Sequence, residues 1–321
     1  MARFKSSAWG LAVAIALVAL VLPLMLPSYA LATECLIFAM AALGCNLLLG
    51  RLGLLSFGQA IFFGAGAYCV GILSLRFGTG IVAGLLAATA VSALLAVAIG
   101  WLATQRTGVY LIMLTLALSQ MFFFLCYAAP DVTGGDNGLM NIPRPNLAFG
   151  GHELLSLASP FAFYVFVATI CTVAFYLMAR LIASPFGATL EAIRDNEDRA
   201  VAIGYDTRLY KVIAFVAAGA VTGLAGGLYA LALKFVPLAN VDLAMSERII
   251  VMTILGGTNA LFGSMLGSIA VVVLSYVLSD IWARWQIILG ALLVAVALYL
   301  RGGLASLLDK AVARANEGAR P

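Results

Sequence analysis

The chain has 321 residues, of which 64% are hydrophobic and 10% are charged, and its mean hydropathy is +1.09. Soluble globular domains average roughly half apolar and a quarter charged residues, so this composition excludes a soluble protein and indicates an integral membrane protein. The net charge of +4 is small and its basic residues form no continuous stripe, which speaks against a nucleic-acid partner.

The apolar runs predict an all-α, polytopic integral membrane protein with roughly 8–10 transmembrane helices. A helix needs about 20 residues to cross a hydrocarbon core of about 30 Å, and the longer runs reach that length. A β-barrel would show alternating segments of about ten residues, which these runs exclude. The predicted spans cover residues 8–26, 32–50, 60–77, 80–103, 108–128, 159–182, 210–235, 247–258, 261–281 and 285–301.

The first predicted span, residues 8–26, follows the basic sequence MARFK. The sequence YALAT comes after it and has the A-x-A spacing of a signal-peptidase site at Ala30 and Ala32, so a cleaved signal is one interpretation. We favour a retained first span, because the run is long for the apolar core of a signal peptide.

Two glycine-rich segments interrupt the apolar runs. In GRLGLLSFGQAIFFGAGAY, residues 50–68, the polar residues are Ser56 and Gln59; in LGGTNALFGSMLGS, residues 255–268, they include Thr258 and Asn259. Glycines let helices approach closely, or form broken turns that face protein or a water-filled cavity. Paired breaks in two halves of a chain indicate a central pathway, so we expect these polar residues to line it; close packing alone is the alternative.

The segment from Pro130 to Pro160, PDVTGGDNGLMNIPRPNLAFGGHELLSLASP, is the longest polar stretch outside the spans on one side. Its glycines, prolines, asparagines and aspartates predict tight turns, above all in the run Gly135, Asp136, Asn137 and Gly138. A long ordered loop usually has a function. We therefore expect residues 130–158 to form an external loop whose turn seats a partner protein; a loose connector is the alternative.

On the other side, residues 183–209 contain the sequence SPFGATLEAIRDNEDRAVAIGYDT, which is far richer in charge than the rest of the chain. Ser184 is expected to cap a single helix, Pro185 to occupy its first turn, and Gly204 to end it. Gly187 and Gly204 permit sharp backbone turns where the chain enters and leaves the helix.

This predicted helix is amphipathic, with Leu190 and Ile193 on its apolar side and Glu191, Arg194 and Glu197 among its charges. Isolated helices of about 15 residues are marginal in water, so we expect another protein to cover Leu190 and Ile193. A solvated connector is the alternative.

The basic residues indicate the orientation of the chain. Thirteen of them lie on the side that holds both termini and the 183–209 segment, and five lie on the other side. The positive-inside rule therefore places both termini, the 183–209 segment and the tail at 302–321 in the cytoplasm.

Catalytic and metal-binding patterns are missing from the sequence. The five cysteines are scattered singly and His152 has no partner cluster, so we expect no catalytic residue and no metal site. No GxxxxGK[ST] phosphate loop is present, so ATP would have to be bound by another chain. The carboxylates of Glu34, Asp131, Asp242, Glu247 and Asp280 lie near predicted span ends, unlike the mid-membrane charges typical of ion-driven transporters.

Six segments follow one another along the chain in this order: GLLSFGQAIFFGAGAY, YLIMLTLALSQ, TGGDNGL, SPFGATLEAIRDNEDRAVAIGYDTRLYKVIAF, GLAGGLYAL and TILGGTNALFGSMLGS. Together they resemble the M-type permease subunits of bacterial branched-chain amino acid ABC importers, over most of the chain. The resemblance implies one permease domain over residues 1–321 in the inner membrane and no cofactor on this chain. It also implies a paralogous permease subunit, two cytoplasmic ATPase subunits and a periplasmic binding protein.

In such a transporter, the SPFG…EAIRDNE segment corresponds to the coupling segment that fits a groove on the ATPase. The resemblance implies import of branched-chain or other hydrophobic amino acids. It extends to importers of urea, short amides and aromatic acids, which remain alternatives for the substrate. A stand-alone secondary transporter or channel is the alternative outside the ABC class, and a neighbouring gene with a phosphate loop would discriminate between the two.

Overall fold

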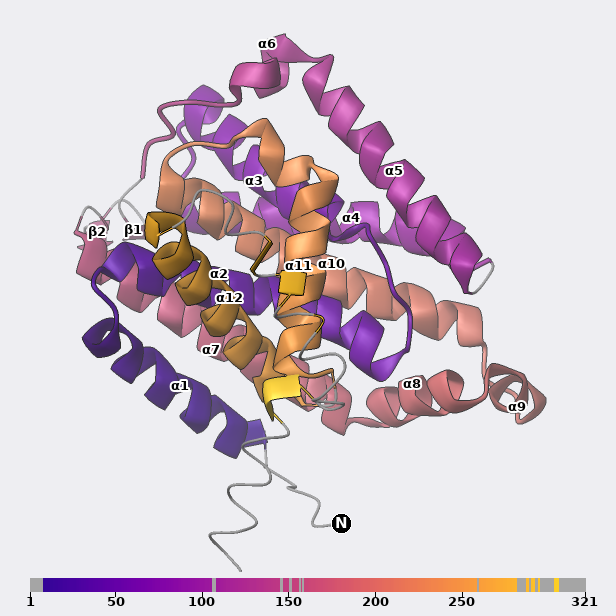
Figure 1. Cartoon of the computed structure of the whole chain (residues 1–321). Helices are drawn as coiled ribbons and strands as arrows, with labels where there is room; N and C mark the ends of the chain where they lie inside the picture. The colour runs from indigo at the N-terminus through magenta and orange to yellow at the C-terminus, as the bar shows by residue number, and fades with distance from the viewer. Residues whose placement is uncertain are drawn as a thin grey trace, which may run out of the picture.

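The computed structural model describes residues 8–105, 108–144, 147–149, 152–155, 157, 159–258 and 260–281, together with 287–288, 290–291, 294 and 303–305. Within these residues the chain is helical apart from two short strands and connecting segments (Figure 1). The predicted all-α architecture is therefore confirmed, with a small hairpin added to it.

Seven helices of the described chain are long and apolar enough to cross a membrane. They are α2 (Tyr29–Asn46, continued by a π-helical turn at Leu47–Arg51), α3 (Gln59–Phe77), α4 (Ile81–Ala103), α5 (Val109–Tyr127), α7 (Pro160–Ala183), α10 (Thr207–Leu233) and α12 (Leu261–Ile281). The first helix, α1 (Ala8–Met25), is slightly shorter and equally apolar. These eight helices match eight of the predicted spans.

The predicted span at 247–258 takes a different form. It is part of α11 (Leu243–Gly256), whose 14 residues are too few to cross a hydrocarbon core. The helix ends at Gly256, and α12 begins at Leu261. The predicted span at 285–301 and the predicted tail at 302–321 lie largely outside the described residues.

The core is built around α2. In its most apolar 18-residue stretch 94% is buried, whereas the corresponding share in α5, at the edge of the molecule, is 22% (Figure 1). Helix α10 packs across α2, α3 and α4. Glycines make this contact close: a side chain on Gly66 of α3 would overlap the backbone of Gly223, and one on Gly226 of α10 would overlap the backbone of Phe63. Small residues that let helix backbones touch are the usual means of association in membranes.

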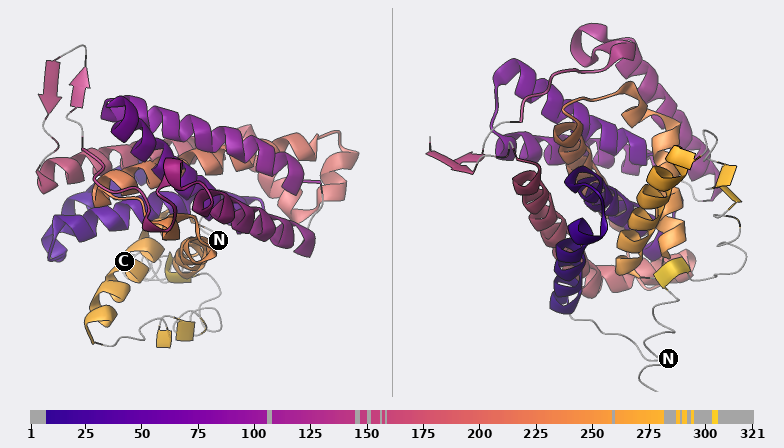
Figure 2. Two further views of the ribbon diagram at one scale, coloured as in Figure 1. Left: turned by 90° about the horizontal axis from the view of Figure 1, so that it is seen from above. Right: turned by 60° about the vertical axis from the view of Figure 1, so that its left-hand side comes forward.

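The segment predicted to be external folds into short pieces: the helical turn α6 (Pro130–Thr133), a 3-10 turn at Gly135–Asn137, and the antiparallel strands β1 (Leu147–Phe149) and β2 (His152–Leu155). Leu139 also pairs with Val236, beyond the end of α10. The strands project from one end of the molecule, and the short helices α8 (Pro185–Asp195) and α9 (Glu197–Ala202) lie at the opposite end (Figure 2).

Candidate functional site

The first glycine-rich segment is an unwound stretch of backbone between α2 and α3, at residues 52–58. Side chains from distant helices satisfy its polar groups. The hydroxyl of Thr115 on α5 accepts a hydrogen bond from Phe57 N at 3.1 Å, and the hydroxyl of Ser246 on α11 donates to Phe57 O at 2.6 Å. Irregular backbone is tolerated inside a membrane protein only where its polar groups find such partners or water.

The predicted pathway residues in this segment have local partners. Ser56 is buried and its Oγ accepts from Gly58 N at 3.2 Å. Gln59 is fully buried and its Oε1 accepts from the Thr222 hydroxyl of α10 at 3.0 Å. Both residues thus stabilise the break in this conformation, and their contact with a permeant molecule stays a prediction.

The two glycine-rich segments lie against each other, although about 200 residues separate them in sequence. A side chain on Gly50 would overlap the backbone carbonyl of Thr258, which is half-buried. Asn46 Nδ2 donates to Ala260 O at 3.2 Å and to Ser264 Oγ at 3.0 Å. The end of α2 is therefore joined to the break between α11 and α12. The fourth predicted pathway residue, Asn259, lies outside the described residues.

The segment predicted as one helix from Ser184 to Gly204 forms two helices. Asn196 interrupts it in an extended conformation, and its Oδ1 accepts from Arg199 N at 2.9 Å, which caps α9. Asparagine favours such caps over helix interiors because its side chain competes for backbone groups. The expectation of a single helix was wrong on this point.

The predicted ends of the segment are close to the observed ones. Pro185 occupies the first turn of α8, and Gly204, with φ +96°, follows the end of α9. Ser184 precedes α8, but its hydroxyl donates backward to Leu181 O at 2.6 Å and caps no N–H of α8. Gly187 is required by packing, because a side chain there would overlap the carbonyl of Ile182.

The apolar residues of α8 face this chain's own core. Leu190 is 0% exposed and Ile193 is 4% exposed, and both belong to the main hydrophobic cluster. The expectation that another protein covers them was therefore wrong: α8 packs on α7, α10 and the turn after α2, which a sequence pattern does not reveal. The large exposed apolar side chains between Ser184 and Gly204 are Val201 (54%), in the last turn of α9, and Ile203 (68%), directly after it.

Charged side chains hold α8 against the turn after α2. Glu191 forms an ion pair with Arg51, and the Arg194 guanidinium donates to the backbone carbonyl of Gly50. The aliphatic part of Arg194 also packs beside Gly53, where φ is +72°. These contacts connect the predicted coupling residues directly to the first glycine-rich break.

A second anchor lies where α9 meets α10. Lys211, only 2% exposed, places its Nζ 2.5 Å from Glu197 Oε1, which also accepts from the Thr207 hydroxyl at 3.0 Å. A cavity of about 410 Å³ lies beside this pair, lined by residues of the 52–54 stretch and of the α8–α9 junction. A buried lysine requires such a partner, because an unpaired charge away from water is costly.

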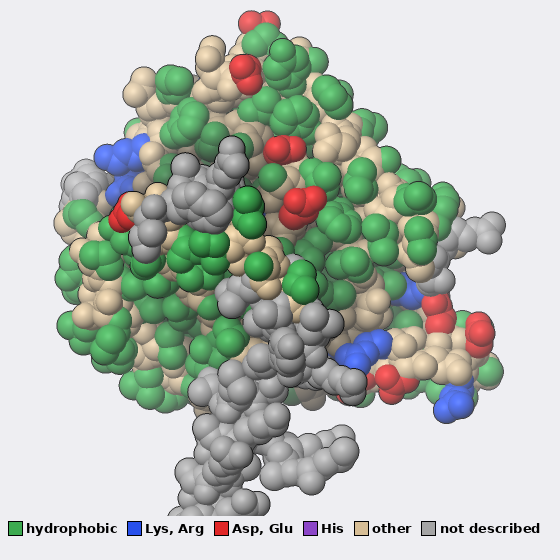
Figure 3. Space-filling model, viewed as in Figure 1, with side chains coloured by type: hydrophobic (Ala, Val, Ile, Leu, Met, Phe, Trp, Pro, Cys, Tyr) green, Lys and Arg blue, Asp and Glu red, His purple; other side chains and the backbone are tan. Residues whose placement is uncertain are grey.

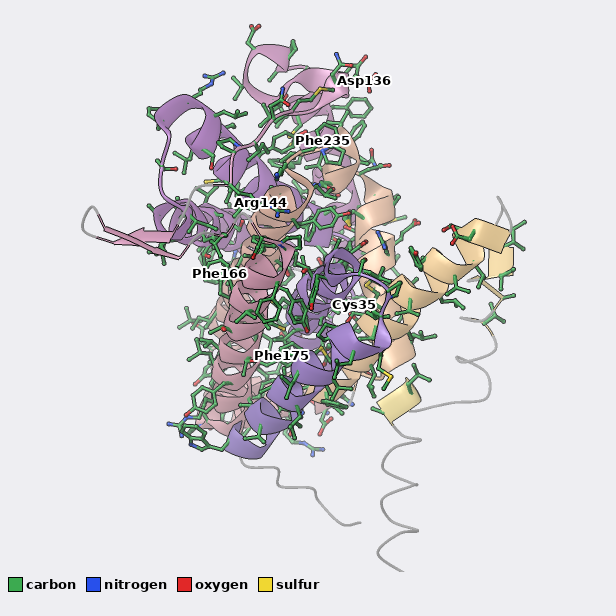
Figure 4. The ribbon with its side chains drawn as sticks, turned by 90° about the vertical axis from the view of Figure 1, so that its left-hand side faces the viewer. Cys35, Asp136, Arg144, Phe166, Phe175 and Phe235 are labelled. Carbon is green, nitrogen blue, oxygen red and sulfur yellow. The ribbon has the colours of Figure 1, made fainter. Side chains whose placement is uncertain are left out.

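The turn at residues 134–138, predicted to be external, is built by glycines with positive φ, at Gly134, Gly135 and Gly138. Gly138 lies against the carbonyl of Val236, so a larger residue there would separate the turn from the α10–α11 connection. Asp136 and Asn137 are exposed at its tip, and their contact with a partner protein stays a prediction. Figure 4 shows Phe235 and Arg144 between Asp136 and the body of the helices.

Arg144 secures this end of the molecule. Its Nε donates to Leu231 O at 2.5 Å, at the last turn of α10, and its guanidinium lies 4.4 Å from the centre of the Phe163 ring. An arginine at a helix C-terminus satisfies carbonyls that have no partner within the helix. Arg144 therefore connects the segment after the 134–138 turn to the end of α10.

One ion pair was not predicted from the sequence. Glu34 of α2 and Arg248 of α11 form an ion pair at 3.2 Å, and the Arg248 guanidinium lies 4.3 Å from the centre of the Phe38 ring. Glu247 beside it is exposed. The sequence placed Glu34 and Glu247 near predicted span ends. The only signal for the ion pair was the presence of Glu34 and Arg248 within otherwise apolar runs.

The described residues contain no group of three or more His, Cys, Asp or Glu side chains that could hold a metal ion. Among these residues, all five cysteines are free thiols, four of them buried.

Comparison with known proteins gives the family. Residues 28–297 match the family described as branched-chain amino acid transport system / permease component. Two curated relatives are the high-affinity branched-chain amino acid transport system permease proteins LivM of Escherichia coli K12 and of Salmonella typhimurium LT2. Each is 28% identical over 85% of this chain and 69% of its own length. No solved structure matches this chain.

The family match covers α2 to α12. It therefore includes both glycine-rich breaks and the charged contacts that link α8 to the first of them. The family describes a permease, which moves a molecule through the membrane, and not an enzyme. The chain is a multi-pass membrane protein that belongs to the branched-chain amino acid transport permease family.

Proposed function

We propose that this chain is one of two paralogous permease subunits of an ATP-driven importer in the bacterial inner membrane. The two subunits form the pathway for branched-chain or other hydrophobic amino acids, which a periplasmic binding protein delivers. Two cytoplasmic ATPase subunits bind and hydrolyse ATP, and this chain, one permease domain over residues 1–321, binds no cofactor. The printed names of the two relatives support the substrate class.

One observation carries the proposal: the segment between α7 and α10 has a side for this chain and a side for a partner. Its α8 helix is fixed to Gly50 and Arg51, next to the first glycine-rich break. Its α9 end presents Val201 and Ile203 outward. An exposed pair of large aliphatic residues on a charged, water-facing segment fits a groove on another protein. Movement of such a partner would reach the break through α8.

Contacts among the basic residues support the proposed orientation. Arg51 and Lys211, which the sequence placed in the cytoplasm, pair with Glu191 of α8 and Glu197 of α9. Arg76, placed outside, donates to the backbone of Asp131 in the external segment. Figure 3 shows Lys, Arg, Asp and Glu side chains gathered around α8 and α9, at an end of a surface that is otherwise largely hydrophobic.

Asp136 and Asn137 are proposed to contact the binding protein. Asp136→Lys reverses a charge at an exposed position and leaves the glycines of the turn in place, so it should lower uptake at limiting substrate by about tenfold, as for the loss of one charged contact. Gly138→Val is unsuitable as a test, because it would clash with Val236 and distort the turn itself. Unchanged uptake by Asp136→Lys would make the loop a connector.

The decisive experiment identifies ligand and energy source together. The cognate binding protein is screened by thermal shift against branched-chain amino acids, urea, short amides and aromatic acids. Uptake of its ligand is then measured in proteoliposomes that hold the whole transporter. We expect a branched-chain amino acid and strict dependence on internal ATP. Uptake by this chain without ATPase subunits would instead establish a stand-alone transporter.

A further inference from the structure

Arg208 and Trp101 meet at one end of two adjacent membrane-spanning helices. Trp101 lies in the last turn of α4, and Arg208 is the second residue of α10, which packs along α4. The guanidinium carbon of Arg208 lies 3.7 Å from the centre of the Trp101 ring, and its Nη2 donates to Trp101 O at 3.3 Å. The two helices are therefore joined at this end by a cation stacked on an aromatic ring.

The start of α10 is an electrostatically unfavourable place for a cation. The N-terminus of a helix carries partial positive charge, so Arg208 adds charge of the same sign. Lys211, three residues further, has Glu197 as its partner. Asp206 precedes the helix and accepts a hydrogen bond from Leu209 N at 3.2 Å through Oδ1, as its cap. None of the ion pairs among the described residues includes Arg208, which therefore lacks a counter-ion in this part of the chain.

Most of the hydrogen-bonding capacity of Arg208 is also unused. A guanidinium carries several N–H donors in a planar fork and no acceptor. Within the described residues its only hydrogen bond goes to Trp101 O, and Nε has no partner. Trp101 O is one of the last carbonyls of α4, which cannot be satisfied within the helix itself. Capping α4 thus accounts for one donor of Arg208 and leaves the others for an anion.

The exposed side chains around the pair indicate that it lies where the helices leave the hydrocarbon core. Trp101 is 54% exposed, and Leu209, next to Arg208 on α10, is 52% exposed. Tyr110 in the first turn of α5 and Tyr205 shortly before α10 are exposed as well. Figure 1 shows the starts of α5 and α10 at the same end of the molecule, beside α9. Tryptophan and tyrosine are enriched at the depth of the lipid headgroups.

We propose that Arg208 and Trp101 form a binding site for the phosphate group of an acidic phospholipid. The guanidinium donates to the phosphate oxygens, which its planar fork matches, and the Trp101 ring fixes its orientation. The bound anion offsets the positive charge at the start of α10.

The apolar neighbours of Arg208 favour a lipid over a soluble anion. Leu209 and Ile213 are both exposed and lie one turn apart on α10, so they share one side of a membrane-spanning helix. Acyl chains attached to the bound phosphate would cover them, whereas inorganic phosphate would leave them uncovered. This inference goes beyond the proposed import function and does not depend on which molecule the permease transports.

Trp101 itself serves as the reporter in the test. The full-length chain has four tryptophans, and Trp9, Trp282 and Trp285 are replaced by phenylalanine so that only Trp101 fluoresces. In phosphatidylcholine vesicles, quenching by phosphatidylglycerol with brominated acyl chains is compared with quenching by equally brominated phosphatidylcholine. We expect phosphatidylglycerol to bind about fivefold more tightly. The ratio between the two lipids cancels any change in the position of the ring.

Three variants separate a site from general surface charge. Arg208→Gln should lower the ratio to about one, because the attraction of a basic residue for an acidic headgroup is lost. Arg208→Lys should keep most of the ratio, because the charge remains. Arg199→Gln removes the same charge from an exposed position on the neighbouring helix α9 and should leave the ratio unchanged, so it is the matched control.

The outcomes are distinct. A ratio of about one in the chain with Arg208 intact overturns the site, and this result needs no folded Arg208→Gln protein. An equal loss of the ratio in Arg199→Gln also overturns it, because the attraction then belongs to the surface charge as a whole. Loss of the ratio on addition of inorganic phosphate, but not of sodium chloride at the same ionic strength, would assign the site to a free anion instead of a lipid.

Discussion

The two short helices between α7 and α10 differ in the direction of their apolar side chains. Leu190 and Ile193 of α8 point into the chain's own core, whereas Val201 and Ile203 at the end of α9 point away from it. One residue, Asn196, separates these opposite arrangements. The comparison shows that attachment to the permease and attachment to a partner are assigned to different helices, so they can be disrupted separately.

The largest expected effect is that of Ile193→Asp. The change buries a carboxylate among apolar side chains, and burying an unpaired polar or charged group without a partner costs several kcal/mol. We expect loss of folded permease from the membrane fraction, measured by size-exclusion chromatography of detergent extracts. Ile203→Asp at the exposed position is the control for the charge itself. A normal yield of Ile193→Asp would mean that α8 separates readily from the core.

The second-largest expected effect is on binding of the ATPase to the exposed end of α9. Ile203→Asp should leave the permease folded and reduce co-purification of the ATPase, because full burial of an isoleucine side chain contributes roughly 1.5–3 kcal/mol. This corresponds to about a tenfold to hundredfold weaker complex. Pull-down of the ATPase by tagged permease measures it. Equal recovery of the ATPase with wild type and variant would show that α9 is not the contact and would remove the difference between the two helices.

A smaller effect is expected where α8 meets the first glycine-rich break. Arg194→Ala removes the donor to the Gly50 carbonyl and the packing beside Gly53, worth about 1–2 kcal/mol for a charged hydrogen bond that is partly exposed. The ATPase should still bind, but uptake per ATP hydrolysed should fall severalfold. Arg180→Ala, an exposed arginine at the end of α7, is the matched control. Unaltered coupling would show that force does not pass through Arg194.

The smallest expected effect is on the melting temperature, and it distinguishes Gly204 from Gly187. Gly204→Ala places a side chain in open space but at φ +96°, so the cost is conformational and about 1 kcal/mol, visible as a shift in melting temperature of a few degrees at most. Gly187→Ala is the contrasting variant, because its side chain would overlap the carbonyl of Ile182. Similar melting temperatures for both variants would contradict the rigid contact of α8 with α7.

Sequence patterns predicted a structural feature correctly where its physical cause lies within a few neighbouring residues. Apolar runs of helical length predicted the long helices, because a hydrocarbon core requires every backbone group to be paired within the segment. The turn at residues 134–138 followed from glycines that adopt positive φ without a side-chain clash. Gly204 marked the end of the predicted coupling segment for the same reason, and Pro185 marked its start because proline lacks an N–H that the first helical turn would leave unpaired.

Patterns were insufficient where the partner of a residue lies far away in sequence. The spacing of Leu190 and Ile193 showed an apolar side but not which surface covers it, and the single helix expected there failed because Asn196 caps a second one. Similarly, residues 247–258 were predicted as a span, although α11 has only 14 residues and ends at the second break.

The amino-acid sequence by itself determined that this protein crosses the membrane many times, where its backbone turns, and to which family it belongs, since composition and local sterics act within a few residues. Only the tertiary structure decided that Asn46 bonds to Ser264, that Arg194 reaches Gly50, and that Glu34 pairs with Arg248. These contacts join residues more than 140 positions apart. Their formation depends on how the helices pack, because the energy of a polar contact inside a membrane depends on the partner that packing brings to it.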